Sequence, residues 1–184
     1  MPQPVPPAVA GRYRVGDVIG RGGRATVYEA QDPLLGRKVA LKLFTATATS
    51  PEEVRLQQAE ARLIAGLDHF ALTTLYDAGV DVGDPEQPRI FLVMERVPGS
   101  DLRRQLREST LTPGQTATLG SDLAQGLEAV HDAGFLHRDV KPANVLLTSV
   151  EAEPGSPVFA YLVDFGIAAA VSYTHLTLPT NREV

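Results

Sequence analysis

The chain has 184 residues, 43% of them hydrophobic and 21% charged, which is the composition of one globular domain or two small lobes. A formal net charge of −5 argues against a nucleic-acid partner, because nucleic-acid binding depends on basic surfaces. The chain has no cysteine, and no apolar run approaches the roughly 18 residues of a membrane span, so we expect a cytoplasmic protein without disulfides, thiolate metal sites or membrane contact in this segment.

The first half of the chain predicts a small lobe, residues 11–95, that consists mainly of strands. Residues 1–10 are rich in proline and predict a disordered leader. A helix is predicted over residues 50–67, because Ser50 and Pro51 provide an N-cap and a proline at the first helical position. Apolar alternation and short connections predict five antiparallel strands, at residues 13–19, 25–30, 39–44, 73–77 and 89–94.

After residue 95 the pattern becomes helical, so we place a hinge at residues 96–100 and a second lobe at residues 101–170. Thr112 and Pro113 form a second capped helix start, and Gly134 is expected to end that helix. The helix carries an apolar stripe that should face the core of the second lobe. The stripe consists of Leu119, Leu123, Leu127 and Val130.

A glycine cluster, Gly20-Arg21-Gly22-Gly23, separates the first two predicted strands. In such a hairpin the backbone can close over a polyanion and direct its N–H groups at phosphate oxygens. Taken alone, the cluster is more often a tight turn. It also departs from the G-x-G-x-x-G pattern, because Ala25 stands where the third glycine belongs. A phosphate-binding role therefore depends on the other motifs.

Lys42 ends the sequence Val39-Ala40-Leu41-Lys42 on the next predicted strand. This matches the V-A-I-K signature, in which the lysine pairs with the α- and β-phosphates of a nucleotide. A lone strand lysine would simply be exposed. Glu60, however, lies on the apolar stripe of the predicted helix, where an unpaired acid is costly. We therefore predict an ion pair between Lys42 and Glu60.

Residues 136–147 carry the most specific pattern in the chain. Asp139 and Asn144 are five residues apart between apolar runs, as in H-R-D-L-x-x-x-N, where the acid takes the substrate hydroxyl proton and the amide binds a metal ion. Asp164 follows in a D-F-G sequence, whose aspartate chelates magnesium. An aspartate and glycine at a strand end would otherwise be an ordinary turn. Four motifs in this order, each on the expected kind of element, make coincidence negligible.

With these motifs, residues 11–170 resemble the Hanks-type protein kinase family, and in particular its bacterial serine/threonine branch. Residues 30–42 and 137–144 carry the narrower match. The resemblance implies an α+β, bilobal protein-kinase-like fold with a complete five-stranded N-lobe plus one helix and an incomplete, mainly helical C-lobe. It implies ATP and Mg²⁺ as cofactors. Members of this branch often carry a transmembrane helix beyond the kinase domain, so membrane anchoring of a longer parent protein stays open.

The resemblance also implies roles for individual residues. The catalytic residues would be Asp139, Lys141, Asn144, Lys42 and Glu60. The nucleotide would be bound by Ile19, Gly20, Arg21, Gly22, Gly23, Val27, Ala40, Lys42, Met94, Glu95, Val97, Leu146 and Asp164. The metal would be held by Asn144 and Asp164. Lys141 is typical of serine/threonine-specific members. Arg138, directly before the catalytic aspartate, implies regulation by autophosphorylation and thus self-association.

The expected activity is ATP-dependent phosphorylation of serine and threonine hydroxyls on proteins. One alternative is a pseudokinase that binds nucleotide or partners as a scaffold, which the filled catalytic positions argue against. A second is a small-molecule phosphotransferase of kinase-like fold, which the glycine-rich hairpin and Lys141 argue against.

Residues 171–184 are expected to be a non-native tail. The composition shifts abruptly after residue 170, and residues 171–180 are similar to the translation of a transposase-type sequencing-library adapter. The alternative is a divergent native loop. If the activation loop and the remaining helices are missing, the chain as written should be inactive.

Overall fold

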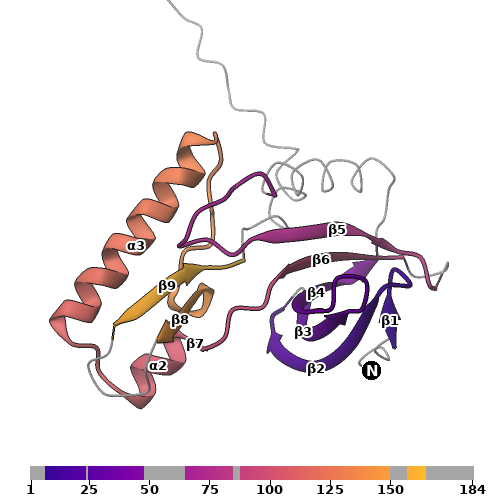
Figure 1. Ribbon diagram of the computed structural model, residues 1–184, viewed down its shortest axis with the longest axis horizontal. Helices are drawn as coiled ribbons and strands as arrows, with labels where there is room; N and C mark the ends of the chain where they lie inside the picture. Colours follow the sequence, from indigo (N-terminus) through magenta and orange to yellow (C-terminus); the bar gives the residue numbers. More distant parts are fainter. Residues whose placement is uncertain (1–6, 24, 48–64, 85–87, 150–156, 165–184) are drawn as a thin grey trace, which may run out of the picture.

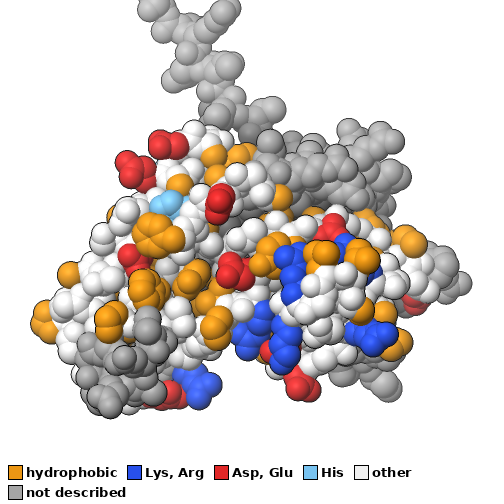
Figure 2. Space-filling view, in the orientation of Figure 1, with side chains coloured by type: hydrophobic (Ala, Val, Ile, Leu, Met, Phe, Trp, Pro, Cys, Tyr) orange, Lys and Arg blue, Asp and Glu red, His pale blue; other side chains and the backbone are white. Residues whose placement is uncertain are grey.

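The computed structural model describes residues 7–23, 25–47, 65–84, 88–149 and 157–164. These residues form two β-sheets, and one long helix packs against the second sheet (Figure 1). Figure 2 shows one face of the molecule, on which most Lys and Arg side chains lie over the larger sheet and several hydrophobic side chains lie over the long helix. No helix among the described residues is long and apolar enough to cross a membrane.

The larger sheet has six antiparallel strands in the order β1-β2-β3-β4-β6-β5. The strands are β1 (Ala8–Val9), β2 (Tyr13–Arg21), β3 (Ala25–Asp32), β4 (Arg37–Thr47), β5 (Leu75–Asp81) and β6 (Arg89–Glu95). All five predicted strands form. The fourth begins at Leu75 rather than at residue 73, because the backbone N–H of Thr73 donates to Leu162 at the end of β9 instead.

The prediction of a disordered leader over residues 1–10 is wrong for its last residues. Ala8 and Val9 pair with β2, and the Val9 side chain is fully buried in the core on that side of the sheet. The carbonyl of Pro7 accepts a hydrogen bond from Val15 N (3.1 Å). Proline lacks an N–H group but keeps its carbonyl, so a proline-rich segment can still add an edge to a sheet.

The predicted helix over residues 50–67 lies largely outside the described residues, which resume at residue 65. Ala65 and Gly66 form a turn, and Leu67 is not helical, so the prediction is wrong at this end of the helix. Leu67 nevertheless packs against the larger core cluster, which is what its apolar side chain requires.

The smaller sheet has the order β7-β8-β9 and carries the helices of the second half. Its elements are β7 (Ser100–Asp101), α2 (Leu102–Glu108), α3 (Pro113–Asp132), the 3₁₀ turn η1 (Pro142–Asn144), β8 (Val145–Ser149) and β9 (Val158–Leu162). Thr112 and Gln115 form the capping box at the start of α3, as the sequence predicts. Gly134 follows the helix with φ 82°, a conformation that favours glycine.

Helix α3 packs along β9 and contributes its apolar stripe to the core, with Val130 fully buried. Asp122, also on the inner face, accepts a hydrogen bond from Ala160 N of β9 (3.2 Å). On the other side, Leu72 bridges to Leu162 in parallel, so the segment before β5 reaches the end of β9. These contacts fix the end of β9, where Asp164 follows.

Candidate active site

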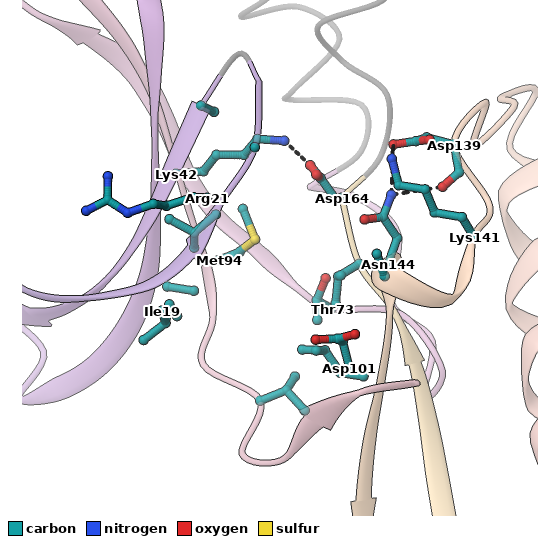
Figure 3. A pocket seen from close by; sticks show the side chains of 18 of the residues that line it. Ile19, Arg21, Lys42, Thr73, Met94, Asp101, Asp139, Lys141, Asn144 and Asp164 are labelled. Carbon is teal, nitrogen blue, oxygen red and sulfur yellow. Dashed lines mark hydrogen bonds and ion pairs between the residues drawn. The ribbon is translucent and has the colours of Figure 1, made fainter. Parts of the chain in front are cut away.

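A cleft of about 750 Å³ lies between the two sheets and receives side chains from both (Figure 3). This is within the range of small-molecule sites, which run from about 300 to 1,000 Å³. Every predicted site residue that the structure describes lines this cleft except Gly20. Glu60, predicted to pair with Lys42, lies outside the described residues.

The glycine hairpin between β2 and β3 forms part of the wall of the cleft. Gly22 N donates to Ala25 O (2.9 Å), which closes the turn between β2 and β3. Arg21, Gly22 and Gly23 line the cleft. Gly20 instead lies opposite Val27 in the β2–β3 ladder. A role for Gly20 in contacting a ligand therefore has no support from the cleft lining.

One end of the cleft is apolar. Its lining includes side chains from both sheets, namely Val27, Ala40, Met94 and Leu146. Ala40 and Met94 are direct partners across β4 and β6. This end has two facing apolar walls and suits a flat, hydrophobic group.

The chain between β6 and β7 provides backbone groups at this apolar end, and two hydrogen bonds decide which of them are left for a ligand. Glu95 N donates to Thr74 O (2.9 Å), so of its two backbone groups only the carbonyl is a candidate partner for a ligand. The Arg96 guanidinium, held by Glu29 (3.3 Å), donates to the carbonyl of Val97, which leaves the Val97 N–H. The segment therefore presents one acceptor and one donor.

Lys42 and Asp164 form an ion pair across the cleft (Figure 3). Lys42 projects from β4 and is almost fully buried, while Asp164 follows β9 with φ 67°. A left-handed conformation is strained for a residue other than glycine, and such strain concentrates at functional sites. A buried ammonium needs a carboxylate partner, and in this structure Asp164 fills that role.

Asp139, Lys141 and Asn144 form a compact hydrogen-bonded cluster. Lys141 Nζ lies 2.7 Å and Asn144 Nδ2 lies 2.8 Å from the same carboxylate oxygen of Asp139. Burial alone would raise the pKa of Asp139, but the hydrogen bonds from Lys141 and Asn144 outweigh it and hold that pKa below its ordinary value. Asp139 is therefore ionised at neutral pH and can accept a further hydrogen bond.

His137 connects this cluster to the segment that carries Asp164. Its side chain is buried, Nε2 lies 3.1 Å from the carbonyl of Val163, and Nδ1 accepts from Asp139 N (3.4 Å). Burial lowers the pKa of His137. A backbone bond from Val163 N to Asn144 O (2.9 Å) reinforces the connection. The positions of Asp139 and Asp164 are therefore coupled.

The side-chain oxygen atoms of Asp164 and Asn144 are of the kind that bind a magnesium ion. The amide nitrogen of Asn144 is turned to Asp139, which leaves its amide oxygen on the side that faces Asp164 (Figure 3). Mg²⁺ is commonly held by one or two carboxylates together with phosphates and waters. Among the described residues there is no cluster of three or more His, Cys, Asp or Glu that could hold a metal by itself.

Sequence reasoning missed several residues that line the cleft. They are Phe44, Thr73, Arg96, Gly99, Ser100, Asp101, Arg103, Arg104, Ala143 and Val163. Asp101 could have been found, because it is the N-cap of the helix that directly follows the predicted hinge. Thr73 carries no such signal.

Residues 13–182 match the protein kinase domain. A probable serine/threonine-protein kinase of Streptomyces coelicolor is 41% identical over 181 residues, which cover 97% of this chain and 26% of that protein. The serine/threonine-protein kinase PknE of Mycobacterium tuberculosis is 37% identical over 169 residues, with 91% of this chain and 28% of that protein covered. The chain thus spans about a quarter of the length of these curated relatives.

The foreign origin expected for residues 171–184 stays a prediction, since these residues lie outside the described part and the domain match runs into them as far as residue 182.

The crystal structure of the Mycobacterium tuberculosis PknI kinase domain is similar with a TM-score of 0.71 and 31% identity, over 87% of this chain and 61% of that domain. The domain match, the bacterial relatives and this structure agree, and the chain belongs to the protein kinase domain family, in its Hanks-type bacterial serine/threonine branch.

Proposed function

We propose that this chain carries the nucleotide-binding and catalytic-loop part of a protein serine/threonine kinase, which transfers the γ-phosphoryl group of ATP to serine or threonine hydroxyls of proteins. The observation that carries the proposal is the convergence of two clusters in one cleft. The Lys42–Asp164 ion pair borders one part of it, and the Asp139–Lys141–Asn144 cluster borders another.

The apolar end of the cleft supports adenine as the bound base. Adenine is flat, which fits between Val27 and Ala40 on one side and Leu146 on the other. Its amino group is a donor and its neighbouring ring nitrogen is an acceptor. This pair complements the Glu95 carbonyl and the Val97 N–H. A base edge with two acceptors would not match both groups.

The triphosphate would extend from the base towards the glycine hairpin and Lys42. The backbone N–H group of Gly23 and the Lys42 ammonium offer positive charge for phosphate oxygens, while the Gly22 N–H closes the turn. Asp164 and Asn144 would hold Mg²⁺, which neutralises charge on the phosphates when bound. In that state the Asp164 carboxylate would turn from Lys42 towards the metal, and Lys42 would be released to the phosphates.

The residues around Asp139 would handle the acceptor. The ionised Asp139 carboxylate accepts the hydrogen of the serine or threonine hydroxyl and orients its oxygen towards the γ-phosphorus. Lys141, at 2.7 Å from Asp139, supplies a positive charge where the transferring group passes. Catalysis in such a site depends mainly on positioning and charge stabilisation rather than on covalent steps.

Regulation by autophosphorylation between copies of the protein forms part of the proposal. Arg138 lines the cleft beside Asp139 and has φ 62°. Within the described residues it forms no ion pair. A cation in this place is suited to a phosphate group on the segment that follows Asp164.

The test is γ-phosphate transfer by the full-length protein, measured with labelled ATP and Mg²⁺ on three acceptors: a generic basic protein, small alcohols and aminoglycosides. Transfer to serine and threonine of the basic protein is the expected result. Transfer confined to a small molecule, or nucleotide binding with no transfer to any acceptor, would refute it. The Asp139→Asn variant controls for contaminating kinases.

A further inference from the structure

Thr73 is a buried polar residue in the cleft wall that none of the sequence motifs includes. Its side chain is 6% exposed, lines the cleft and lies between Met94 and Asn144 in Figure 3. In the part of the chain that the structure describes, the hydroxyl has no hydrogen-bond partner. The hydroxyl oxygen is not one of the fully buried side-chain atoms that lack a partner, so it is open to the cleft and can donate to a bound ligand. A valine at this position would keep the shape of the side chain but not this donor.

The backbone around Thr73 fixes where that hydroxyl lies. Thr73 N donates to Leu162 O at the end of β9 (3.3 Å), two residues before Asp164. The next carbonyl, of Thr74, accepts from Glu95 N (2.9 Å) at the end of β6. Thr73 therefore sits on a short crossing between the base end of the cleft and its ion-pair end.

We infer that the Thr73 hydroxyl donates a hydrogen bond to N7 of the adenine ring. The inference rests on the proposed function. With the amino edge of adenine at Glu95 and Val97 and the phosphates at Lys42, the imidazole edge of the ring faces the wall between these two ends. N7 is an acceptor without a hydrogen, and a threonine hydroxyl is a donor.

The neighbouring side chains cannot replace Thr73 in this contact. Met94 and Val163 also line the cleft, and neither has a hydrogen to donate, while the side-chain amide of Asn144 already donates to Asp139. Thr73 thereby becomes a specificity-determining residue that favours a purine with nitrogen at position 7 over one with carbon there.

The test compares the Mg²⁺ complexes of ATP and 7-deaza-ATP, which has a C–H group in place of N7. Affinities are measured by calorimetry on the full-length protein, as wild type, Thr73→Val, Thr73→Ser and the matched control Thr74→Val, whose hydroxyl does not line the cleft. Wild type should prefer ATP by about two- to tenfold, the net contribution of one hydrogen bond. Thr73→Val should lose this preference through weaker ATP binding alone. Thr73→Ser and Thr74→Val should keep it.

The outcomes separate the two proposals. If wild type binds neither nucleotide, the proposed function and this inference both fail. If wild type binds both equally, or if Thr73→Val keeps the preference for ATP, only the inference fails. Binding of 7-deaza-ATP by Thr73→Val shows that this variant is folded. Should it not fold, the wild-type comparison alone decides.

Discussion

Asn144 donates its side-chain amide to Asp139 twice, to the carboxylate at 2.8 Å and to the backbone carbonyl at 2.9 Å. The turn η1 makes this possible, because it brings residues five apart in sequence to the same side of the loop. One residue therefore both holds the proposed base in place and, through its amide oxygen, is available to a metal. The spacing of Asp139 and Asn144 is a geometric requirement of the loop.

Replacing Asp139 with asparagine should lower turnover of the full-length protein by about 10²- to 10⁴-fold, the range for loss of a positioned general base. The affinity for MgATP should stay within about twofold of wild type, because Asp139 faces the acceptor rather than the base. Steady-state kinetics and nucleotide calorimetry measure the two quantities. Asp132→Asn, an exposed acid near the end of α3, is the matched control and should change neither.

Replacing Lys141 with methionine should reduce kcat by about 10²- to 10³-fold, a loss similar to that of one group that stabilises transition-state charge. The KM for ATP should change little, since Lys141 bonds to Asp139 rather than to the proposed nucleotide groups. Lys38→Met is the control, because Lys38 pairs with Glu29 away from the cleft. An equal loss in both variants, or a change confined to KM, would contradict the role given to Lys141.

Asp164→Asn should abolish the Mg²⁺ dependence of nucleotide binding. The variant removes the only charged metal ligand proposed here and also frees Lys42 from its ion pair. We expect ATP to bind the variant equally well with and without Mg²⁺ in calorimetry, whereas wild type should bind MgATP more tightly. Asp68→Asn changes an exposed acid outside the cleft and should behave as wild type. A wild-type response to Mg²⁺ in Asp164→Asn would exclude Asp164 as a ligand.

Local signals were enough to predict five of the six strands of the larger sheet, the capped start of α3 and the loop around Asp139. Each depends on residues that are close in sequence, such as Thr112 with Gln115 or Asp139 with Asn144. Residue type and spacing determine these contacts almost alone. The end of α3 at Gly134 was predictable for the same reason.

The features that were missed depend on contacts between distant segments. Thr73 reaches the cleft only because its backbone bonds to Leu162, and a threonine in a short loop gives no sign of this. The hydrogen bond from Arg96 to Glu29 likewise connects the hinge to β3, which is far away in sequence. The strand Ala8–Val9 was hidden by the prolines around it, since burial of Val9 depends on the whole sheet being present.

Asp32→Asn should lower the stability of the folded protein at neutral pH. It should also make stability fall less steeply as the pH decreases towards 3. Asp32 is fully buried and accepts two hydrogen bonds from Arg12, at 2.7 and 3.0 Å. These bonds, opposed by burial, hold its pKa below the ordinary value near 3.8. A carboxyl whose pKa is lower in the folded state contributes stability above its unfolded-state pKa and loses it as the pH falls through the folded value.

Thermal unfolding of wild type and Asp32→Asn, at pH 7 and at pH 3, measures this effect. The difference in midpoint should be largest at pH 7 and should shrink at pH 3. Asp17→Asn, an exposed acid on β2, should leave both midpoints unchanged. A difference that is as large at pH 3 as at pH 7 would mean that the charge of Asp32 is not what stabilises the sheet.

Gly99→Ala should destabilise the junction between the two sheets. Gly99 has φ 129°, and a Cβ atom there would collide with the carbonyl oxygen of Leu147, next to the pairing of Ser100 with that residue. The backbone conformation alone costs a residue other than glycine about 1–3 kcal/mol, and relief of the collision would separate β7 from β8. Because Gly99 also lines the cleft, nucleotide affinity should fall together with stability.

Gly120→Ala is the matched control: Gly120 lies exposed within α3 with open space around it, so alanine should raise stability by about 0.5–1 kcal/mol. Urea denaturation of the two variants measures both effects, and a Gly99→Ala protein at least as stable as wild type would show that the junction tolerates a side chain.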